Sequence, residues 1–129
     1  MYVICSDYQL KIVASTAGCK ESNESVIKEA ARKVNTKLVF KKCDTFDPRA
    51  VGVTIGEVLK HVEKDDYVIV NYTGGTAVVR LILGAVGVAL TMFMKTKIIY
   101  SIDYPGGIKV AADHTEALKD IFRELRSLH

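Results

Sequence analysis

The sequence lacks the cysteine spacing and the long apolar stretch that mark disulfide-bonded or membrane-spanning proteins. Its three cysteines, Cys5, Cys19 and Cys43, share no C-x-x-C spacing, and their odd number argues against a disulfide framework. The longest apolar run, residues 81–94, falls short of the roughly 18 residues of a membrane span. The N-terminus lacks the basic lead and sustained apolar region of a secretory signal. We therefore expect a cytoplasmic protein with no membrane partner.

The common phosphate-binding and metal-binding signatures are also missing. Neither G-x-x-x-x-G-K-[ST] nor G-x-G-x-x-G occurs, which removes support for ATP- and NAD-dependent chemistry. His61, His114 and His129 are far apart and match no zinc-ligand spacing. The net charge of +3 suits a small anionic ligand but is too weak to indicate duplex nucleic acid. We expect no metal and no cofactor.

What is present is an apolar chain long enough for one compact domain. Its 129 residues are 49% hydrophobic, so a sizeable core is available and disorder is disfavoured. No internal repeat or low-complexity tract is visible. We interpret residues 1–129 as a single domain.

Strand and helix patterns alternate along the chain. Residues 6–8 are interpreted as a turn, so that 2–5 and 10–14 form a hairpin or an edge strand running into the first central strand. Asp47 and Pro48 mark a helix start, and Asp113 with Glu116 forms a capping pair. The predicted strands are 2–5, 10–14, 37–42, 67–70, 97–102 and 108–111, and the predicted helices are 23–34, 48–62, 76–94 and 113–128.

This alternation predicts parallel β-α-β units with right-handed crossovers. The fold class is therefore α/β, a three-layer Rossmann-like sandwich with a mainly parallel central sheet. In such a sheet the loops after the strands' carboxyl ends meet at one edge, where ligands bind. We expect loops 15–22, 44–47, 71–76 and 103–107 to meet there, and all four contain hydroxyl, carboxylate or glycine residues. The alternative for any single loop is that these residues only form the loop and bind no ligand.

The loop after strand 67–70 carries the strongest signal. That strand is an unbroken β-branched and aromatic run, typical of burial on both faces. It ends in Asn71 and Tyr72, and the turn Thr73-Gly74-Gly75-Thr76 follows before a long apolar helix begins at Ala77. Adjacent glycines let a ligand approach the backbone, and a helix N-terminus attracts anions. This pattern predicts a site for a phosphate-bearing ligand.

Arg80 is the one charged residue in helix 77–94. It lies one turn after Thr76, from where its forked guanidinium could reach an anion at the glycine turn. Alternatively it forms a salt bridge or lies at the helix edge with its charged head in water.

The helix itself is apolar nearly all round, so one sheet face cannot cover it. Gly84, Ala85 and Gly87 would allow another backbone to approach closely. We expect a symmetric homodimer through helix 76–94, the alternative being a monomer whose neighbouring helices cover it.

The segment 68–76, with its N-x-T-G-G-T turn, resembles a motif of the CARF superfamily, the CRISPR-associated Rossmann-fold domains. Residues 11–18, an apolar strand followed by Ser15, Thr16, Ala17 and Gly18, are similar to the first loop of those domains. Together the two motifs cover about an eighth of the chain. The glycine turn is moderately specific, and the first loop alone is weak.

The resemblance implies a twofold dimer that binds cyclic oligoadenylate in type III CRISPR defence, and cyclic tetraadenylate is the ring that we expect. A free-standing member resembles a metal-independent ring nuclease, in which a ribose 2′-hydroxyl attacks the adjacent phosphate and leaves a 2′,3′-cyclic phosphate. With this resemblance we expect Ser15 and Thr16 to take part in catalysis, and Arg80 is our own candidate for the catalytic positive charge. The residues expected to bind the ligand come from the first, third and fourth loops: Ala17, Gly18, Asn71, Tyr72, Thr73, Gly74, Gly75, Thr76, Asp103 and Tyr104.

One position departs from the family pattern. Lysine commonly follows the N-x-T-G-G-T turn, but this chain has Ala77 there. The difference weakens the expectation of catalysis more than the expectation of ligand binding. Arg80, three residues later and close to the same helix face, is our candidate substitute. The alternatives are a sensor that binds the ring without cleaving it, and an unrelated Rossmann-like protein that binds another nucleotide.

Overall fold

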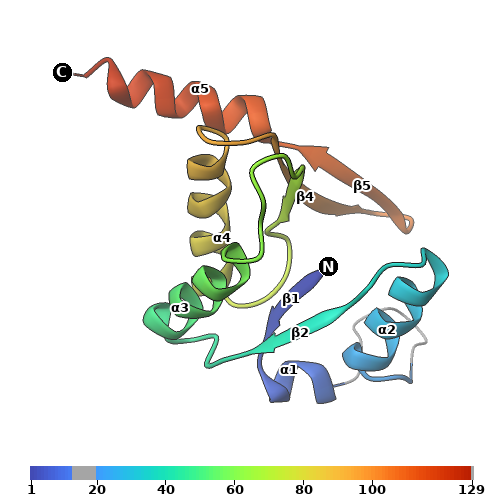
Figure 1. The fold of residues 1–129 in the computed structure, drawn as a ribbon. Helices are drawn as coiled ribbons and strands as arrows, with labels where there is room; N and C mark the ends of the chain where they lie inside the picture. Colours follow the sequence, from blue (N-terminus) through green and yellow to red (C-terminus); the bar gives the residue numbers. More distant parts are fainter. Residues whose placement is uncertain (13–19, 129) are drawn as a thin grey trace. The chain divides into compact units, whose positions relative to one another are not determined.

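The computed structural model describes residues 1–12 and 20–128, apart from the side chain of Asp103. The chain divides into two compact units, Met1–Lys60 and His61–His129, which we describe separately. Each unit combines helices with a small sheet (Figure 1), so the α/β class is confirmed. Among the described residues, none of the helices has both the length and the apolar character needed to cross a membrane.

The first unit contains a two-stranded parallel sheet. Strand β1 (Tyr2–Cys5) pairs with β2 (Val39–Lys42) from end to end. Helix α3 (Pro48–Leu59) contacts β1 and begins as predicted, because the Asp47 side chain accepts a hydrogen bond from the Arg49 N–H at 2.9 Å. Val51 of this helix is fully buried.

The start of the chain differs from the prediction. Residues 6–8 are not a free turn, because Ser6 caps a short helix, α1 (Asp7–Lys11), through a capping box with Gln9. Leu10 belongs to this helix and is buried, so a strand beginning at residue 10 was wrong. Helix α2 (Asn23–Lys33) follows within the predicted helix 23–34, with Ser22 as its cap.

The second unit contains a three-stranded sheet in the order β3 (Val68–Asn71), β4 (Thr96–Tyr104), β5 (Ile108–Asp113). Strands β3 and β4 are parallel, whereas β4 and β5 form an antiparallel hairpin. The sheet is therefore mixed. The predicted loop 103–107 is shorter in the structure. Residues 103 and 104 continue β4, and residues 105–107 form the turn of the hairpin.

Helix α4 (Ala77–Leu90) lies against β3 and β4, and helix α5 (Thr115–Arg126) contacts both α4 and β4 (Figure 1). Gly87 makes the close approach of α4 to the sheet possible, because a Cβ there would lie 3.0 Å from Ile98 Cγ1. Gly87 therefore faces the sheet and is not free for a second backbone.

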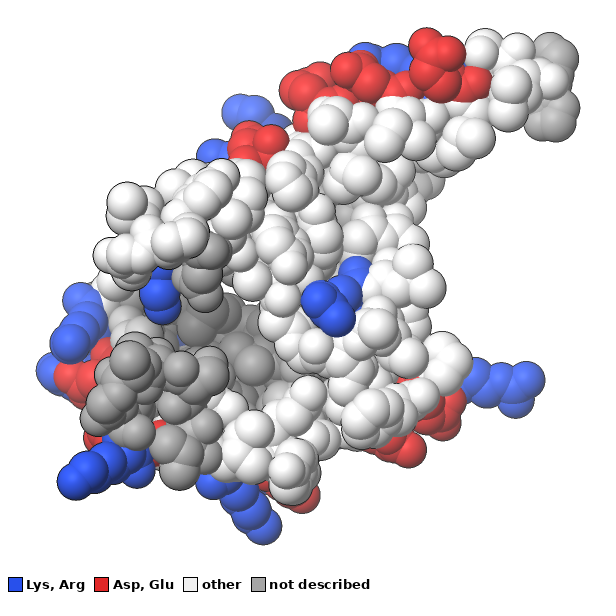
Figure 2. Space-filling model, turned by 180° about the vertical axis from the view of Figure 1, so that it is seen from behind, with Lys and Arg blue, Asp and Glu red and all other residues white. Residues whose placement is uncertain are grey.

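Figure 2 shows acidic side chains along one edge of α5 and uncharged side chains along the other.

Two further expectations fail in this unit. Strand β3 is not buried on both faces: Val70 is 8% exposed, whereas Ile69 is 57% exposed. The predicted capping pair is not formed either, because Asp113 Oδ1 accepts from the backbone N–H and the hydroxyl of Thr115. His114 occupies the cap position of α5 without a side-chain capping bond.

Candidate functional site

Hydrogen bonds from its own side chains and from β4 hold the turn after β3. Asn71 Oδ1 accepts from the backbone N–H of Thr73 at 3.0 Å and from the Thr73 hydroxyl at 2.5 Å. Thr73 Oγ1 in turn accepts from the backbone N–H of Ser101 in β4 at 2.7 Å. Gly75 has φ of +89°, a conformation that favours glycine. The turn therefore has a defined shape, and the Thr73 hydroxyl proton is already donated within the protein.

The turn leads directly into the N-terminus of α4. Thr76 caps the helix, and its Oγ1 accepts from the Val79 N–H at 3.3 Å. The N–H groups of Gly74 and Gly75 have no hydrogen-bond partner among the described residues. A Cβ at Gly74 would meet no atom within 4 Å, so the backbone is open there. Free N–H groups beside a helix start favour a bound anion.

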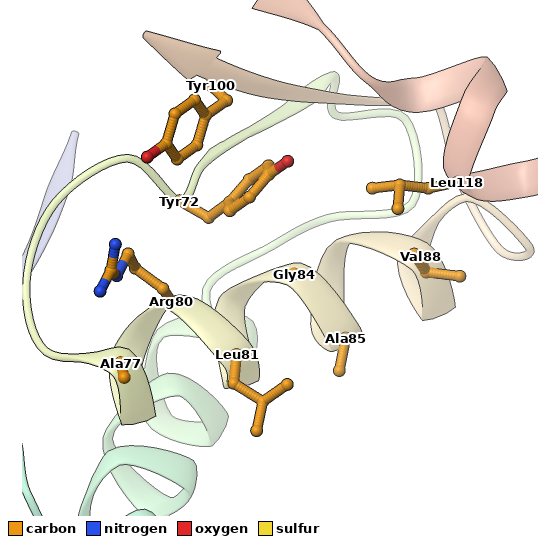
Figure 3. Close-up of a pocket in the computed structure, with 9 residues that line it drawn as sticks. All are labelled: Tyr72, Ala77, Arg80, Leu81, Gly84, Ala85, Val88, Tyr100 and Leu118. Atoms are coloured by element: carbon orange, nitrogen blue, oxygen red, sulfur yellow. The ribbon is translucent and has the colours of Figure 1, made fainter. Parts of the chain in front are cut away.

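A cleft of about 530 Å³ runs along α4 beside this turn. Figure 3 shows Arg80 on the side of α4 that faces the rings of Tyr72 and Tyr100, whereas Leu81 and Ala85 point away from them. The cleft is within the size range of small-molecule sites. Its lining is mostly apolar and consists of Tyr72, Ala77, Arg80, Leu81, Gly84, Ala85, Val88, Tyr100 and Leu118.

Three rings from different elements meet next to the cleft. The Tyr72 hydroxyl hydrogen-bonds Nδ1 of His114 at 2.5 Å. The Tyr100 ring stacks on the His114 ring, with centroids 6.0 Å apart and planes 10° apart, and lies 5.0 Å from the Tyr72 ring. Burial, and after it the nearby Tyr100, raise the pKa of the Tyr72 hydroxyl. Tyr72 is therefore a neutral phenol at pH 7, held in one orientation.

Arg80 supplies the positive charge of the cleft. Its side chain is exposed, and no carboxylate of the described residues forms an ion pair with it. The salt-bridge alternative is thus not observed in the described part of the chain. Ala77 lines the same cleft one helical turn earlier. The guanidinium therefore lies in the same cleft as Ala77, which occupies the position where the CARF motif commonly has a lysine.

The structure brings together only part of the predicted site. Asn71 to Thr76 and Arg80 lie at the glycine turn and the cleft. Ser15, Thr16, Ala17 and Gly18 lie outside the described residues, and loop 44–47 belongs to the other unit.

Asp103 and Tyr104 lie farther along β4. They follow the Asn71 partner Ile99 by four and five residues, or about 14–17 Å along the strand. They are the last two residues of β4 before the hairpin turn, and Tyr104 does not line the cleft.

Sequence reasoning missed Tyr100 and His114. In the sequence His114 was considered as a zinc ligand, whereas in the structure it occupies the cap position of α5 and its ring hydrogen-bonds the Tyr72 hydroxyl. Tyr100 lies within a strand whose alternation predicts that it shares a sheet face with Ile98, the buried centre of the unit. That alternation was the one available signal for its position.

The arrangement combines an anion-binding element with an aromatic wall. Free backbone N–H groups and Arg80 suit a phosphate, and two tyrosine rings suit a planar apolar group. No cluster of three or more His, Cys, Asp or Glu side chains that could hold a metal occurs in the part of the chain that is described. Comparison of the chain with protein-family models, with curated proteins and with solved structures gives no match in any of the three.

Proposed function

We propose that this protein binds a cyclic oligoadenylate, in first place cyclic tetraadenylate, and cleaves it as a metal-independent ring nuclease of the CARF type. The observation that carries the proposal is the open glycine turn at the N-terminus of α4, with the Arg80 guanidinium one turn away in the cleft; no carboxylate of the described residues pairs with it. The resemblance of residues 68–76 to the CARF motif selects this ligand among phosphate-bearing molecules.

In this mechanism the protein positions the ribose and stabilises charge on phosphate. The 2′-hydroxyl loses its proton to solvent and its oxygen bonds to phosphorus in line with the departing 5′-oxygen, which takes up a proton from solvent, so that a 2′,3′-cyclic phosphate and a 5′-hydroxyl form. The N–H groups of Gly74 and Gly75 and the guanidinium of Arg80 donate hydrogen bonds to the phosphoryl oxygens. Ser15 and Thr16 remain candidates for orienting the ribose.

The proposal includes a homodimer through helix 76–94. Leu81 is 75% exposed and Phe93, just after α4, is 79% exposed, which leaves apolar surface for a second copy. Of the three small residues expected at this contact, Ala85 points away from the tyrosine rings as Leu81 does (Figure 3), whereas Gly84 lies across from the Tyr72 ring and Gly87 is occupied by the sheet. Sedimentation equilibrium checks this part: a monomer at micromolar concentration contradicts it.

The proposal also includes the three-layer Rossmann-like arrangement. Strands β1 and β3 are each parallel to one neighbour, β2 and β4, and each ends its sheet. Pairing of β1 with β3 would give one mainly parallel sheet in the order 2-1-3-4-5, which is known for α/β folds. Amide NOEs between β1 and β3 are expected in the 14.2 kDa chain; their absence in an assigned spectrum contradicts the single sheet.

The decisive experiment incubates the pure protein with cyclic tetra- and hexaadenylate in excess chelator. Linear products ending in 2′,3′-cyclic phosphate support the ring nuclease, and an intact ring that stays bound indicates the sensor. Absence of binding rejects the proposal, and a thermal midpoint raised only by another nucleotide favours an unrelated binding protein.

Arg80→Ala tests the proposed charge. A charged hydrogen bond to phosphate contributes about 1.5–3 kcal/mol, so the variant should lose at least about tenfold in turnover or affinity. Arg80→Lys should recover part of it, because lysine keeps the charge but not the forked geometry. Arg126→Ala, an exposed arginine at the end of α5, is the matched control. Unchanged binding and turnover in Arg80→Ala removes Arg80 from the site.

A further inference from the structure

The cleft has a gap in its floor at Gly84. Positions 80, 84 and 88 follow one another at helical spacing and lie on one face of α4. A Cβ at Gly84 would meet no atom within 4 Å, so the absent side chain leaves space between Arg80 and Val88. In Figure 3 the Tyr72 ring lies across this gap from the helix.

The fold does not require a glycine at this position. Gly75 is needed for its positive φ, and Gly87 is needed because Ile98 leaves no room for a Cβ. Glycine inside a helix is less favourable than alanine, and at Gly84 no contact offsets this cost. Gly52 in α3 is equally open, so openness alone does not mark a site. What distinguishes Gly84 is the ring opposite it and the cation beside it.

The ring opposite the gap is held in place. The bond from the Tyr72 hydroxyl to His114 Nδ1 fixes the far end of the ring, and Tyr100 packs against both residues. A ring that is already immobilised loses little conformational freedom when a planar ligand stacks on it. His114 therefore acts as a positioning residue for Tyr72.

We propose that the space between the Tyr72 ring and Gly84 is a slot for a purine base, whose nucleotide phosphate is bound by Arg80. A purine is planar and stacks on aromatic rings, and its phosphate matches the one cation in the cleft lining. The inference rests on the proposed function only for the choice of adenine. It assigns one base of the cyclic oligoadenylate to a defined location.

The test uses adenosine 5′-monophosphate, with ribose 5-phosphate and adenosine as ligands that lack the base or the phosphate. The wild-type protein should bind the nucleotide saturably and bind either fragment at least about tenfold more weakly. Equal binding of ribose 5-phosphate and the nucleotide overturns the slot, because the base would then contribute nothing.

Gly84→Leu fills the gap and should weaken nucleotide binding at least about tenfold, while its thermal midpoint equals or exceeds that of the wild type. Gly52→Leu is the matched control and should bind as the wild type does. Should Gly84→Leu fail to fold, Gly84→Ala, with one added methyl group, should weaken binding a few-fold. Unchanged affinity in a folded Gly84 variant overturns the proposal.

Parallel titrations with cyclic tetraadenylate separate this inference from the proposed function. If the ring binds and the Gly84 variants do not weaken it, the slot is wrong and the proposed function stands. If the mononucleotide binds in the slot and the ring does not bind, the slot stands and the proposed function is wrong. If neither ligand binds the wild type, both are wrong.

Discussion

The Tyr72 hydroxyl and the His114 Nδ1 lie 2.5 Å apart, although 42 positions separate these residues in the chain. The bond joins the end of β3 to the start of α5. It makes the orientation of a cleft-lining ring depend on a residue that does not itself line the cleft.

A double-mutant cycle measures this contact. Tyr72→Phe removes the hydroxyl and keeps the ring, and His114→Ala removes the imidazole partner. A hydrogen bond of this kind contributes about 0.5–1.5 kcal/mol, so we expect a coupling free energy of about 1 kcal/mol from urea unfolding of the four proteins. Additive effects of the two substitutions would show that the contact contributes nothing.

Thr115 provides a second test of how α5 is attached. Its buried Oγ1 accepts a hydrogen bond from the Ile98 N–H at 2.8 Å, in the interior strand β4. Thr115→Val keeps the shape but leaves this N–H without an acceptor, which should lower the free energy of unfolding by about 1–3 kcal/mol. Thr115→Ser retains the oxygen and should lose clearly less. Equal losses in urea titrations would assign the effect to the methyl group instead.

Gly87→Ala should destabilise the protein even though alanine favours helices. The new Cβ would lie 3.0 Å from Ile98 Cγ1 and 3.2 Å from Cδ1, and Ile98 is fully buried, so it has no room to move. We expect a loss of about 1–3 kcal/mol in unfolding free energy. Gly52→Ala, with open space around it, should be neutral or stabilising. A stabilised Gly87→Ala protein would contradict the close packing of α4 on β4.

Asp113 should make stability depend on pH in the acidic range. The Thr115 hydroxyl and then its backbone N–H donate to the carboxylate and lower the pKa of Asp113 below its ordinary value of 3.8. A lowered folded-state pKa stabilises the fold above the unfolded pKa, and this gain is lost as pH falls through the folded pKa.

The thermal midpoint of the wild type should therefore exceed that of Asp113→Asn by a constant amount near neutral pH. The difference should begin to shrink near pH 4. Asp65→Asn serves as the control, because Asp65 is exposed and lies outside the helices and strands. A difference that does not change between pH 7 and pH 3 would contradict the role of the charged form.

The helices that could be predicted are those whose start signals are local. Asp47-Pro48 and Thr76 each satisfy the first N–H groups of a helix within a few residues, and the structure uses both as predicted. Helix α1 escaped prediction because five residues are too few for a helical period, although its capping pair, Ser6 and Gln9, is present in the sequence.

Pairing between distant strands was harder to predict. The alternation of elements indicated parallel strands, and the pairs β1–β2 and β3–β4 confirm it. The hairpin of β4 and β5 was not foreseen, because residues 103 and 104 resemble turn formers until the antiparallel partner is known. The Tyr72–His114 contact depends on that hairpin, which brings the start of α5 back to the end of β3.

A single oxygen atom, Thr73 Oγ1, donates a hydrogen bond to Asn71 Oδ1 and accepts one from the backbone N–H of Ser101. The hydrogen bond from Ser101 therefore continues the pairing of β4 with the chain beyond Asn71, the last residue of β3. The curvature of the glycine turn and the alignment of the neighbouring strand are consequently coupled through this one atom. A residue without a hydroxyl there would disturb both together, and serine is the replacement that leaves both intact.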